Sequence, residues 1–216
     1  MHATDTAHPK PVLRGVFHEI AAALSLAAWV LLALGAAPGR ARAAALVYGA
    51  TLFALFLTSA LYHRPNWRPR ARLLMRRLDH SAIFLLIAGT YTPFCLVLGG
   101  GAGTTMLAVV WAGAALGLVR AIVWPRAPKP LAAALYVLLG WAVVPVLPAL
   151  RAALGTSALA LLGAGGLVYT VGAVVYATRR PDPFPAVLGY HEVFHALVVA
   201  AAACHFAVAT AAIRAL

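Results

Sequence analysis

Seven long apolar runs divide this sequence almost from end to end. They cover roughly residues 17–37, 43–62, 80–98, 104–123, 131–150, 156–177 and 191–213. About 20 helical residues, at 1.5 Å each, cross the ~30 Å hydrocarbon core of a bilayer, and a spanning backbone must satisfy its own hydrogen bonds. Only 10% of the residues are charged, against about 25% in a typical soluble domain. We therefore predict an all-α integral membrane protein, a bundle of seven transmembrane helices.

The ends of the runs predict the domain organisation. Residues 1–16 are polar and are predicted to form a cytosolic N-terminal segment, followed by one seven-helix transmembrane domain over residues 17–216. The first run is longer than the apolar core of a signal peptide, about 7–15 residues, so we expect a retained helix. Pro93, Pro145 and Pro148 lie inside runs, where they are expected to kink or end a helix.

The distribution of Lys and Arg predicts the orientation. Thirteen lie on the side of the N-terminus and four on the opposite side. The first set is Lys10, Arg14, Arg64, Arg68, Arg70, Arg72, Arg76, Arg77, Arg120, Arg126, Lys129, Arg179 and Arg180, and the second is Arg40, Arg42, Arg151 and Arg214. The positive-inside rule then places the N-terminus in the cytosol and the C-terminus outside. We expect a multi-pass protein of the cell membrane.

The net charge of +12 is also informative about partners. The basic residues are spread between apolar runs and do not form one basic face, which favours contacts with anionic membrane lipids over nucleic acid. Cys95 and Cys204 both fall inside apolar runs, so no disulfide framework is indicated. The pattern predicts no particular oligomeric state.

Ionisable and polar residues collect at the cytosolic ends of three predicted helices. An ionisable group at the centre of a membrane helix costs about 2.5–3.5 kcal/mol, so each one requires an explanation. The second helix ends with Ser59 and His63, the third begins with Asp79 and His80, and the seventh begins with His191, Glu192 and His195. These distant segments therefore share one membrane depth, as a common site requires.

The spacing of the histidines indicates a metal site. His191 and His195 are four residues apart, so their side chains leave one helix face about 6 Å from each other, and Ser59 has the same relation to His63. Three neutral imidazoles with an open fourth position are typical of catalytic zinc. Asp79 would then orient or deprotonate the water at that position, and Ser59 would support the site or help hold an oxyanion.

Simpler interpretations stay open for each residue. The histidines can be hydrogen-bonded interfacial side chains, and Ser59 can bond its own helix. Asp79 can neutralise the neighbouring Arg76 and Arg77. His80 is expected to be a neighbour of the site and not a ligand. His205 lies some 15 Å beyond His195 along the helix, so we expect a hydrogen bond there. His18 and Glu19 begin the first helix at a similar depth, but their lateral position is not predicted.

The string from His191 to His195 also matches H-E-x-x-H, in which Glu192 would be the general base of a metalloprotease. A five-residue match has an appreciable chance rate, and no third ligand follows at the spacing of metzincins. An intramembrane protease is therefore a minor alternative.

Several segments resemble the hemolysin III family, the bacterial branch of the progestin and adipoQ receptor group. They are Ser59-Ala-Leu-Tyr-His63, the stretch from Arg76 to Phe94, His191-Glu-Val-Phe-His195 and Cys204-His205-Phe206. The resemblance spans nearly the whole chain. It implies seven helices with a cytosolic N-terminus and a zinc ion bound by His63, His191 and His195, with Asp79 and Ser59 at the same site. His18-Glu19 is a less typical version of the family's opening motif, so no function is assigned to it.

Two functions follow from the resemblance and the residues together. Adiponectin receptors of the same group are associated with ceramidase activity, and the wider superfamily includes alkaline ceramidases, which implies a zinc-dependent hydrolase of a lipid amide or related acyl bond. Bacterial members were named for haemolysis, which implies a non-enzymatic, pore-forming (cytolytic) or sensor-like membrane protein with structural zinc. Few polar residues lie along the helices beyond the cytosolic cluster, which argues against a wide aqueous pore.

Overall fold

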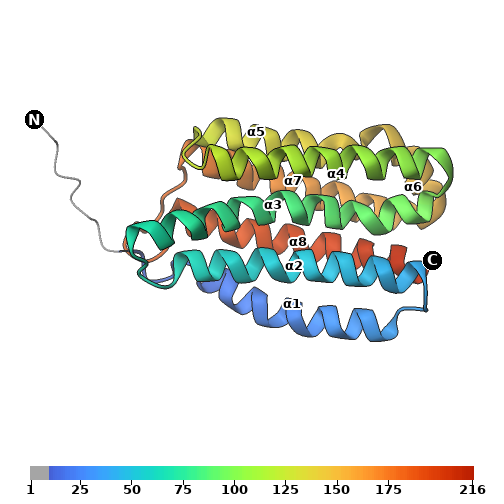
Figure 1. The fold of residues 1–216 in the computed structure, drawn as a ribbon, viewed down its shortest axis with the longest axis horizontal. Helices are drawn as coiled ribbons and strands as arrows, with labels where there is room; N and C mark the ends of the chain where they lie inside the picture. Colours follow the sequence, from blue (N-terminus) through green and yellow to red (C-terminus); the bar gives the residue numbers. More distant parts are fainter. Residues whose placement is uncertain (1–9) are drawn as a thin grey trace, which may run out of the picture.

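The protein is a bundle of long helices that run side by side (Figure 1). The structure, a computed structural model, describes residues 10–216. Six spans are single helices and the fifth is built from three pieces. The elements are α1 (Val16–Gly35), α2 (Arg40–His63), α3 (Pro69–Leu98), α4 (Gly100–Val123), α5 (Lys129–Gly140), the 3-10 helix η1 (Trp141–Val146), α6 (Leu147–Leu154), α7 (Thr156–Thr178) and α8 (Tyr190–Arg214). Seven helical segments of the described residues are long and apolar enough to cross a membrane, which identifies a multi-pass membrane protein.

The largest departure from the predicted spans is the start of α3. This helix begins at Pro69, well before the apolar run that starts at residue 80. Proline is well suited to the first position of a helix, where its missing N–H has no helical partner in any case. The first turns of α3 are rich in arginine, so hydropathy did not indicate that they are helical. They extend the bundle beyond its apolar part.

The internal prolines behave in two ways. Pro145 lies in the 3-10 helix η1 and Pro148 in the first turn of α6, so the predicted interruption of the fifth span is confirmed. By contrast, α3 continues through Pro93 to Leu98, as the predicted span over residues 80–98 requires, so this proline does not end the helix. Pro93 is fully buried, and packing by neighbouring helices can retain a membrane helix despite one missing hydrogen bond.

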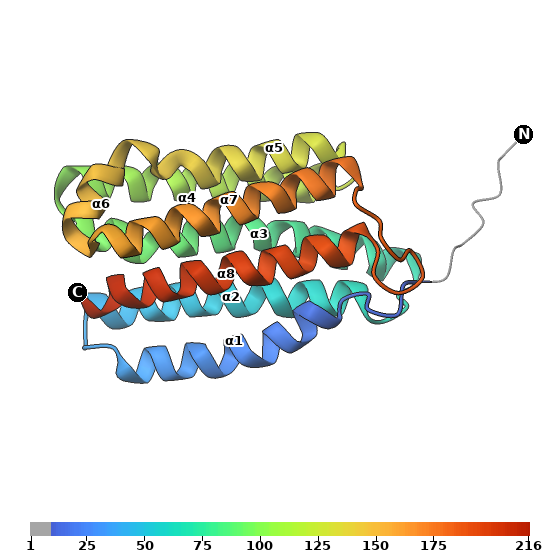
Figure 2. The ribbon, with the colours of Figure 1, turned by 180° about the vertical axis from the view of Figure 1, so that it is seen from behind.

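Two helices connect most of the bundle (Figure 2). Helix α8 packs against α1, α2, α3 and α7, and α3 packs against α2, α4, α5, α6 and α8. Close approach between neighbouring helices depends on small residues, as is common in membranes. A Cβ atom on Gly49 of α2 would lie 2.0 Å from Trp29 of α1, and one on Gly89 of α3 would lie 2.0 Å from Thr51 of α2. The helices consequently sit close enough for side chains near their ends to meet.

Large apolar side chains face away from the bundle. The most exposed include Leu31 (71%), Leu34 (75%), Leu116 (73%), Val123 (75%) and Leu138 (70%). Such surfaces are unfavourable in water and are typical of helices that contact lipid tails.

One end of the bundle brings together the start of α1, the end of α2, the start of α3, the end of α7 and the start of α8, and the C-terminus lies at the other end (Figures 1 and 2). The shared level of the three polar helix ends is thus confirmed. Which end faces the cytosol stays a prediction, as does the domain boundary at residue 16.

Residues 10–15 close this end of the bundle. The N–H groups of Val12 and Leu13 donate to the carbonyls of Ala186 and Val187 at 3.0 and 3.1 Å, in the α7–α8 connection. Lys10 donates to the carbonyl of Pro65 at 2.8 Å, in the α2–α3 connection. The segment therefore ties together two connections that flank the polar cluster.

Candidate functional site

Three histidines from two helices form a buried group at the closed end of the bundle. One ring nitrogen from each of His63, His191 and His195 lies within 4.8 Å of the others, and none of the three residues is more than 9% exposed. The Nε2 atoms of His63 and His191 are 3.1 Å apart. Residues separated by more than 120 positions in the chain therefore meet, as the sequence predicted.

The donor set fits a tetrahedral metal ion. Zinc–nitrogen bonds of about 2.0–2.1 Å place two ligating nitrogens roughly 3.3 Å apart in a tetrahedral site, close to the 3.1 Å between His63 and His191. The same 3.1 Å also suits a hydrogen bond between one protonated and one bare ring nitrogen. A hydrogen bond of this kind joins only two rings, whereas His195 also places a ring nitrogen within 4.8 Å of both. A buried three-histidine group of this kind can hold a metal ion.

His18 at the start of α1 is a fourth histidine of this cluster. Its ring is stacked on that of His195, with centroids 3.8 Å apart and planes 9° from parallel, and it packs edge-on against Phe56 at 5.1 Å. His18 is 3% exposed, and neither ring nitrogen has a hydrogen-bond partner within residues 10–216. The depth of His18 could be predicted from the sequence, but this contact could not, because the lateral position of α1 depends on packing.

Glu192 is turned away from the histidines toward the backbone. One carboxylate oxygen accepts the N–H of Gly189 at 2.9 Å, which caps α8, and the other forms an ion pair with Arg14. Glu192 is fully buried and is not among the residues lining the adjacent cavity. The H-E-x-x-H match therefore gives two clustered histidines but places its glutamate in a structural role, which does not support the metalloprotease interpretation.

Gly15 allows the N-terminal segment to approach the three-histidine group closely. Its φ of +79° is in the left-handed region, which favours glycine. A Cβ atom at this position would lie 2.9 Å from the Cβ of His63. The segment from Lys10 to Gly15 thus packs directly against the backbone that carries one candidate ligand.

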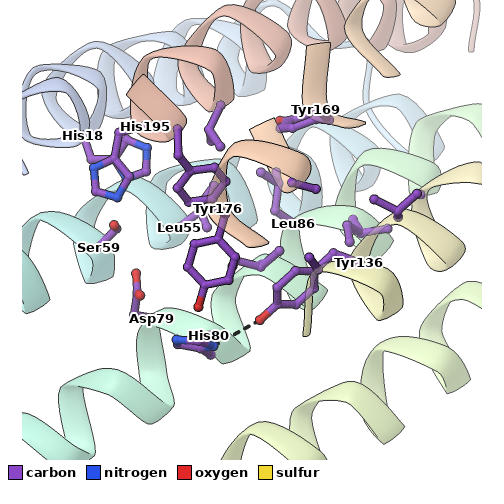
Figure 3. A pocket seen from close by; sticks show the side chains of 18 of the residues that line it. His18, Leu55, Ser59, Asp79, His80, Leu86, Tyr136, Tyr169, Tyr176 and His195 are labelled. Atoms are coloured by element: carbon purple, nitrogen blue, oxygen red, sulfur yellow. Dashed lines mark hydrogen bonds between the residues drawn. The ribbon is translucent and has the colours of Figure 1, made fainter. Parts of the chain in front are cut away.

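Figure 3 shows Ser59 and Asp79 near His195 and His18, with His80 following Asp79 on the same helix. Asp79 and Ser59 are neighbours, with the carboxylate turned toward the hydroxyl. The two ion pairs among the described residues join Arg14 to Glu192 and Arg64 to Glu19. Asp79 therefore forms no direct ion pair with Arg76 or Arg77 among the described residues, although the charge of Arg76 is near enough to act on its carboxylate.

His80 and His205 are bound by other partners. The Nδ1 atom of His80 lies 3.2 Å from the hydroxyl of Tyr136. The Nδ1 of His205 lies 3.0 Å from the carbonyl of Ala201, one turn earlier in α8. Neither belongs to the three-histidine group, so both expectations, a neighbour of the site and a hydrogen-bonded histidine, are confirmed.

A cavity of about 430 Å³ connects these residues with the interior of the bundle. Near the closed end its wall includes Ser59, His63, Asp79, His191 and His195. Deeper in the bundle the wall is mainly apolar, and it reaches residues of α5, η1, α6, α7 and α8. Those deeper residues include Val137, Trp141, Leu147, Leu162, Val198 and His205. The break at η1 contributes Trp141 and Val143, so the interrupted fifth span helps to form this space.

Comparison with known proteins gives the family. Residues 6–206 match the family described as Haemolysin-III related. The chain belongs to this family. It is 36% identical over 199 residues to "Hemolysin-3" of Bacillus cereus, covering 90% of this chain and 88% of that protein. It is 33% identical to the "Hemolysin-3 homolog" of Bacillus subtilis (strain 168), covering 90% of each. A plant relative, "Heptahelical transmembrane protein ADIPOR2" of Oryza sativa subsp. japonica, is 32% identical over 63% of this chain and 67% of its own length.

These matches confirm the resemblance to hemolysin III proteins and to the adiponectin receptor group. Within this member of the family, the structure joins the three predicted metal ligands and places Asp79 and Ser59 on the same cavity. The contact between His18 and His195 and the Arg14–Glu192 pair were not predicted from the sequence. The available signal was that Arg14 and His18 lie near the start of the first helix, at the depth of the site, but this does not show which helices α1 faces.

Proposed function

We propose that this protein is a zinc-dependent hydrolase of lipid amide or related acyl bonds, similar to a ceramidase, whose site lies near the cytosolic face of the cell membrane. The observation that supports it most is the position of the three-histidine group, which borders the same cavity as Asp79 and Ser59. A structural metal site needs neither an adjacent carboxylate nor a space for a substrate.

His63, His191 and His195 are the residues that would hold the ion. A bound zinc ion supplies a Lewis acid that polarises a carbonyl and makes water acidic enough to attack near neutral pH. In the overall reaction, water adds to the acyl carbon, the C–N or C–O bond breaks, and the leaving amine or alcohol gains a proton. Asp79 is proposed to accept the proton from water and return it to the leaving group.

The other polar groups have supporting roles in this proposal. The Ser59 hydroxyl is next to Asp79 and can donate a hydrogen bond to the carboxylate or to a developing oxyanion. The apolar part of the cavity, about 430 Å³ in all, is suited to an acyl chain, since ligand pockets are mostly apolar with a few placed polar groups.

The proposal is tested by separating metal binding from turnover. We expect zinc-loaded Asp79→Asn protein in lipid nanodiscs to keep its zinc but to release fatty acid from a lipid amide at least about 100-fold more slowly, as for loss of a general base. Glu19→Gln is the matched control, because Glu19 is an acid at the same end that is exposed and pairs with Arg64. Equal rates for wild type and Asp79→Asn, or no release from any lipid amide or ester by the wild type, would contradict the proposal.

A membrane-permeabilising function is the second candidate, and the observation in its favour is the name Hemolysin-3 of the Bacillus relatives. In that case, or in a sensor with structural zinc, Asp79→Asn would have little effect while His63→Ala would destabilise the fold, since metal binding energy is folding energy. A conductance in planar bilayers that survives metal removal would support the pore.

A further inference from the structure

The polar end of the cavity, beside the three-histidine group, carries a large excess of positive charge. Among the described residues, five basic side chains line the cavity, together with a single acidic one, Asp79. The basic residues are Lys10, Arg14, Arg72, Arg76 and Lys129. The ion pair with Glu192 compensates Arg14. Burial, followed by the positive charges of Arg72 and Arg14, lowers the pKa of Lys10 below its usual range, as expected where like charges crowd together.

Arg76 on α3 and Lys129 at the start of α5 both line the cavity at this polar end. The Nε atom of Arg76 is buried without a hydrogen-bond partner among the described residues. The ammonium of Lys129 donates to the hydroxyl of Tyr190 at 2.6 Å and lies over the rings of Tyr190 and Tyr176, 4.7 and 5.0 Å from their centroids. Neither residue forms an ion pair within residues 10–216.

Cations in this position need a partner. A partly buried charge loses hydration, and that loss is repaid only by an opposite charge or by well-placed acceptors. Tyrosine rings and one hydroxyl hold Lys129 in place but do not neutralise it. The cavity beside it is apolar farther in, so a ligand with an anionic group at one end and a hydrocarbon chain at the other would satisfy both parts.

We propose that the polar end of the cavity binds the phosphate group of a lipid, with Arg76 and Lys129 as its ligands and the hydrocarbon chain in the apolar part of the cavity. Arg offers a planar set of donors that matches phosphate oxygens, and Lys supplies a compact charge. As a statement about substrate, the proposal rests on the proposed hydrolase function and specifies an anionic acyl lipid. The binding step itself requires neither zinc nor turnover.

Other arginines at the same end distinguish this site from general attraction to an anionic membrane. Arg70 on α3 and Arg126 before α5 are exposed, and neither lines the cavity. Arg70 lies on the same helix as Arg76, Arg126 lies three residues before Lys129, and each carries the same charge as its counterpart. A diffuse attraction to anionic lipid depends on both pairs to a similar extent, whereas a site in the cavity depends on Arg76 and Lys129 alone.

The experiment is a titration of purified protein in uncharged detergent with hexadecyl phosphate, hexadecanol or inorganic phosphate, with and without bound zinc. We expect hexadecyl phosphate to bind at least about tenfold more tightly than hexadecanol, which corresponds to about 1.4 kcal/mol. Arg76→Gln/Lys129→Gln should abolish that difference, and the control Arg70→Gln/Arg126→Gln should retain it. The charge-retaining variant Arg76→Lys/Lys129→Arg should also keep most of the preference, which separates loss of charge from loss of folding.

Each contrary outcome has a definite meaning. Equal affinity for hexadecyl phosphate and hexadecanol, or an equal loss in the control variant, would overturn the proposed site. Binding of inorganic phosphate as tight as that of hexadecyl phosphate would overturn the lipid as its occupant. Retained preference for hexadecyl phosphate without hydrolysis of any lipid would contradict the proposed hydrolase alone, and hydrolysis of neutral lipid amides without that preference would contradict the phosphate site alone.

Discussion

The buried pair between Arg14 and Glu192 allows a sharp test of what the glutamate of the H-E-x-x-H string does. The side chain of Glu192 is fully buried, whereas that of Arg14 is 25% exposed. Removing one partner of a buried ion pair costs about 3–5 kcal/mol, because the other charge is left uncompensated. We therefore expect both Arg14→Gln and Glu192→Gln to lower the free energy of unfolding substantially.

The exposure of the two partners predicts an asymmetry. Arg14→Gln leaves the buried Glu192 carboxylate without a counter-charge and with the Gly189 N–H as its remaining partner, so its cost should lie near 5 kcal/mol, the upper end of that range. Glu192→Gln leaves an Arg14 that can reach water, and its amide oxygen can still accept the Gly189 N–H, so its cost should lie near 3 kcal/mol. The double variant should cost less than the sum, with a coupling of about 2–3 kcal/mol.

The assay is denaturant titration in mixed micelles, with zinc content and hydrolysis measured on the same samples. Glu192→Gln should keep its zinc and most of its activity under conditions where it is folded. An unchanged free energy of unfolding, together with complete loss of turnover, would refute this reasoning and would restore Glu192 as a general base.

Two other contacts of the N-terminal region give further predictions. Gly15→Ala should lower zinc affinity as well as stability, because its Cβ would meet that of His63 at 2.9 Å. The control Gly39→Ala, which has a similar positive φ and nothing within 4 Å of the added Cβ, should lower stability alone. Equal zinc affinities of the two variants, measured by competition with a chelator, would contradict this. His18→Ala should weaken zinc binding by removing the ring stacked on His195, and His18→Phe should largely restore it. If His18→Phe binds zinc as poorly as His18→Ala, the ring nitrogens matter and not the stacking.

The arrangement of the bundle could be predicted wherever hydropathy alone decides it. Seven apolar runs gave seven spans, because a bilayer requires a fixed length of apolar helix. The start of α3 at Pro69 was missed since its first turns are rich in arginine, and hydropathy does not detect helix outside the hydrocarbon core. The sequence left open whether Pro93 ends or only kinks its helix, because the packing around it comes from other helices.

The candidate site was predictable for a similar reason. The depth of His63, His191 and His195 follows from the topology, and the four-residue spacing puts two of them on one face of α8. Depth does not give lateral position, so the stacking of His18 on His195 and the pairing of Arg14 with Glu192 appeared only in the structure. The size and apolar lining of the cavity depend on the break at η1 and could not be predicted from the sequence.

The most direct test of the central claim is the metal content of the purified protein after zinc loading and removal of loose metal. We predict about one zinc per chain in the wild type, and close to none in His63→Ala, His191→Ala and His195→Ala. The matched control is His205→Ala, a histidine of the same cavity that bonds its own helix, and it should retain the full zinc content. A wild type without zinc, or ligand variants that hold as much as the control, would contradict the metal centre and the function built on it.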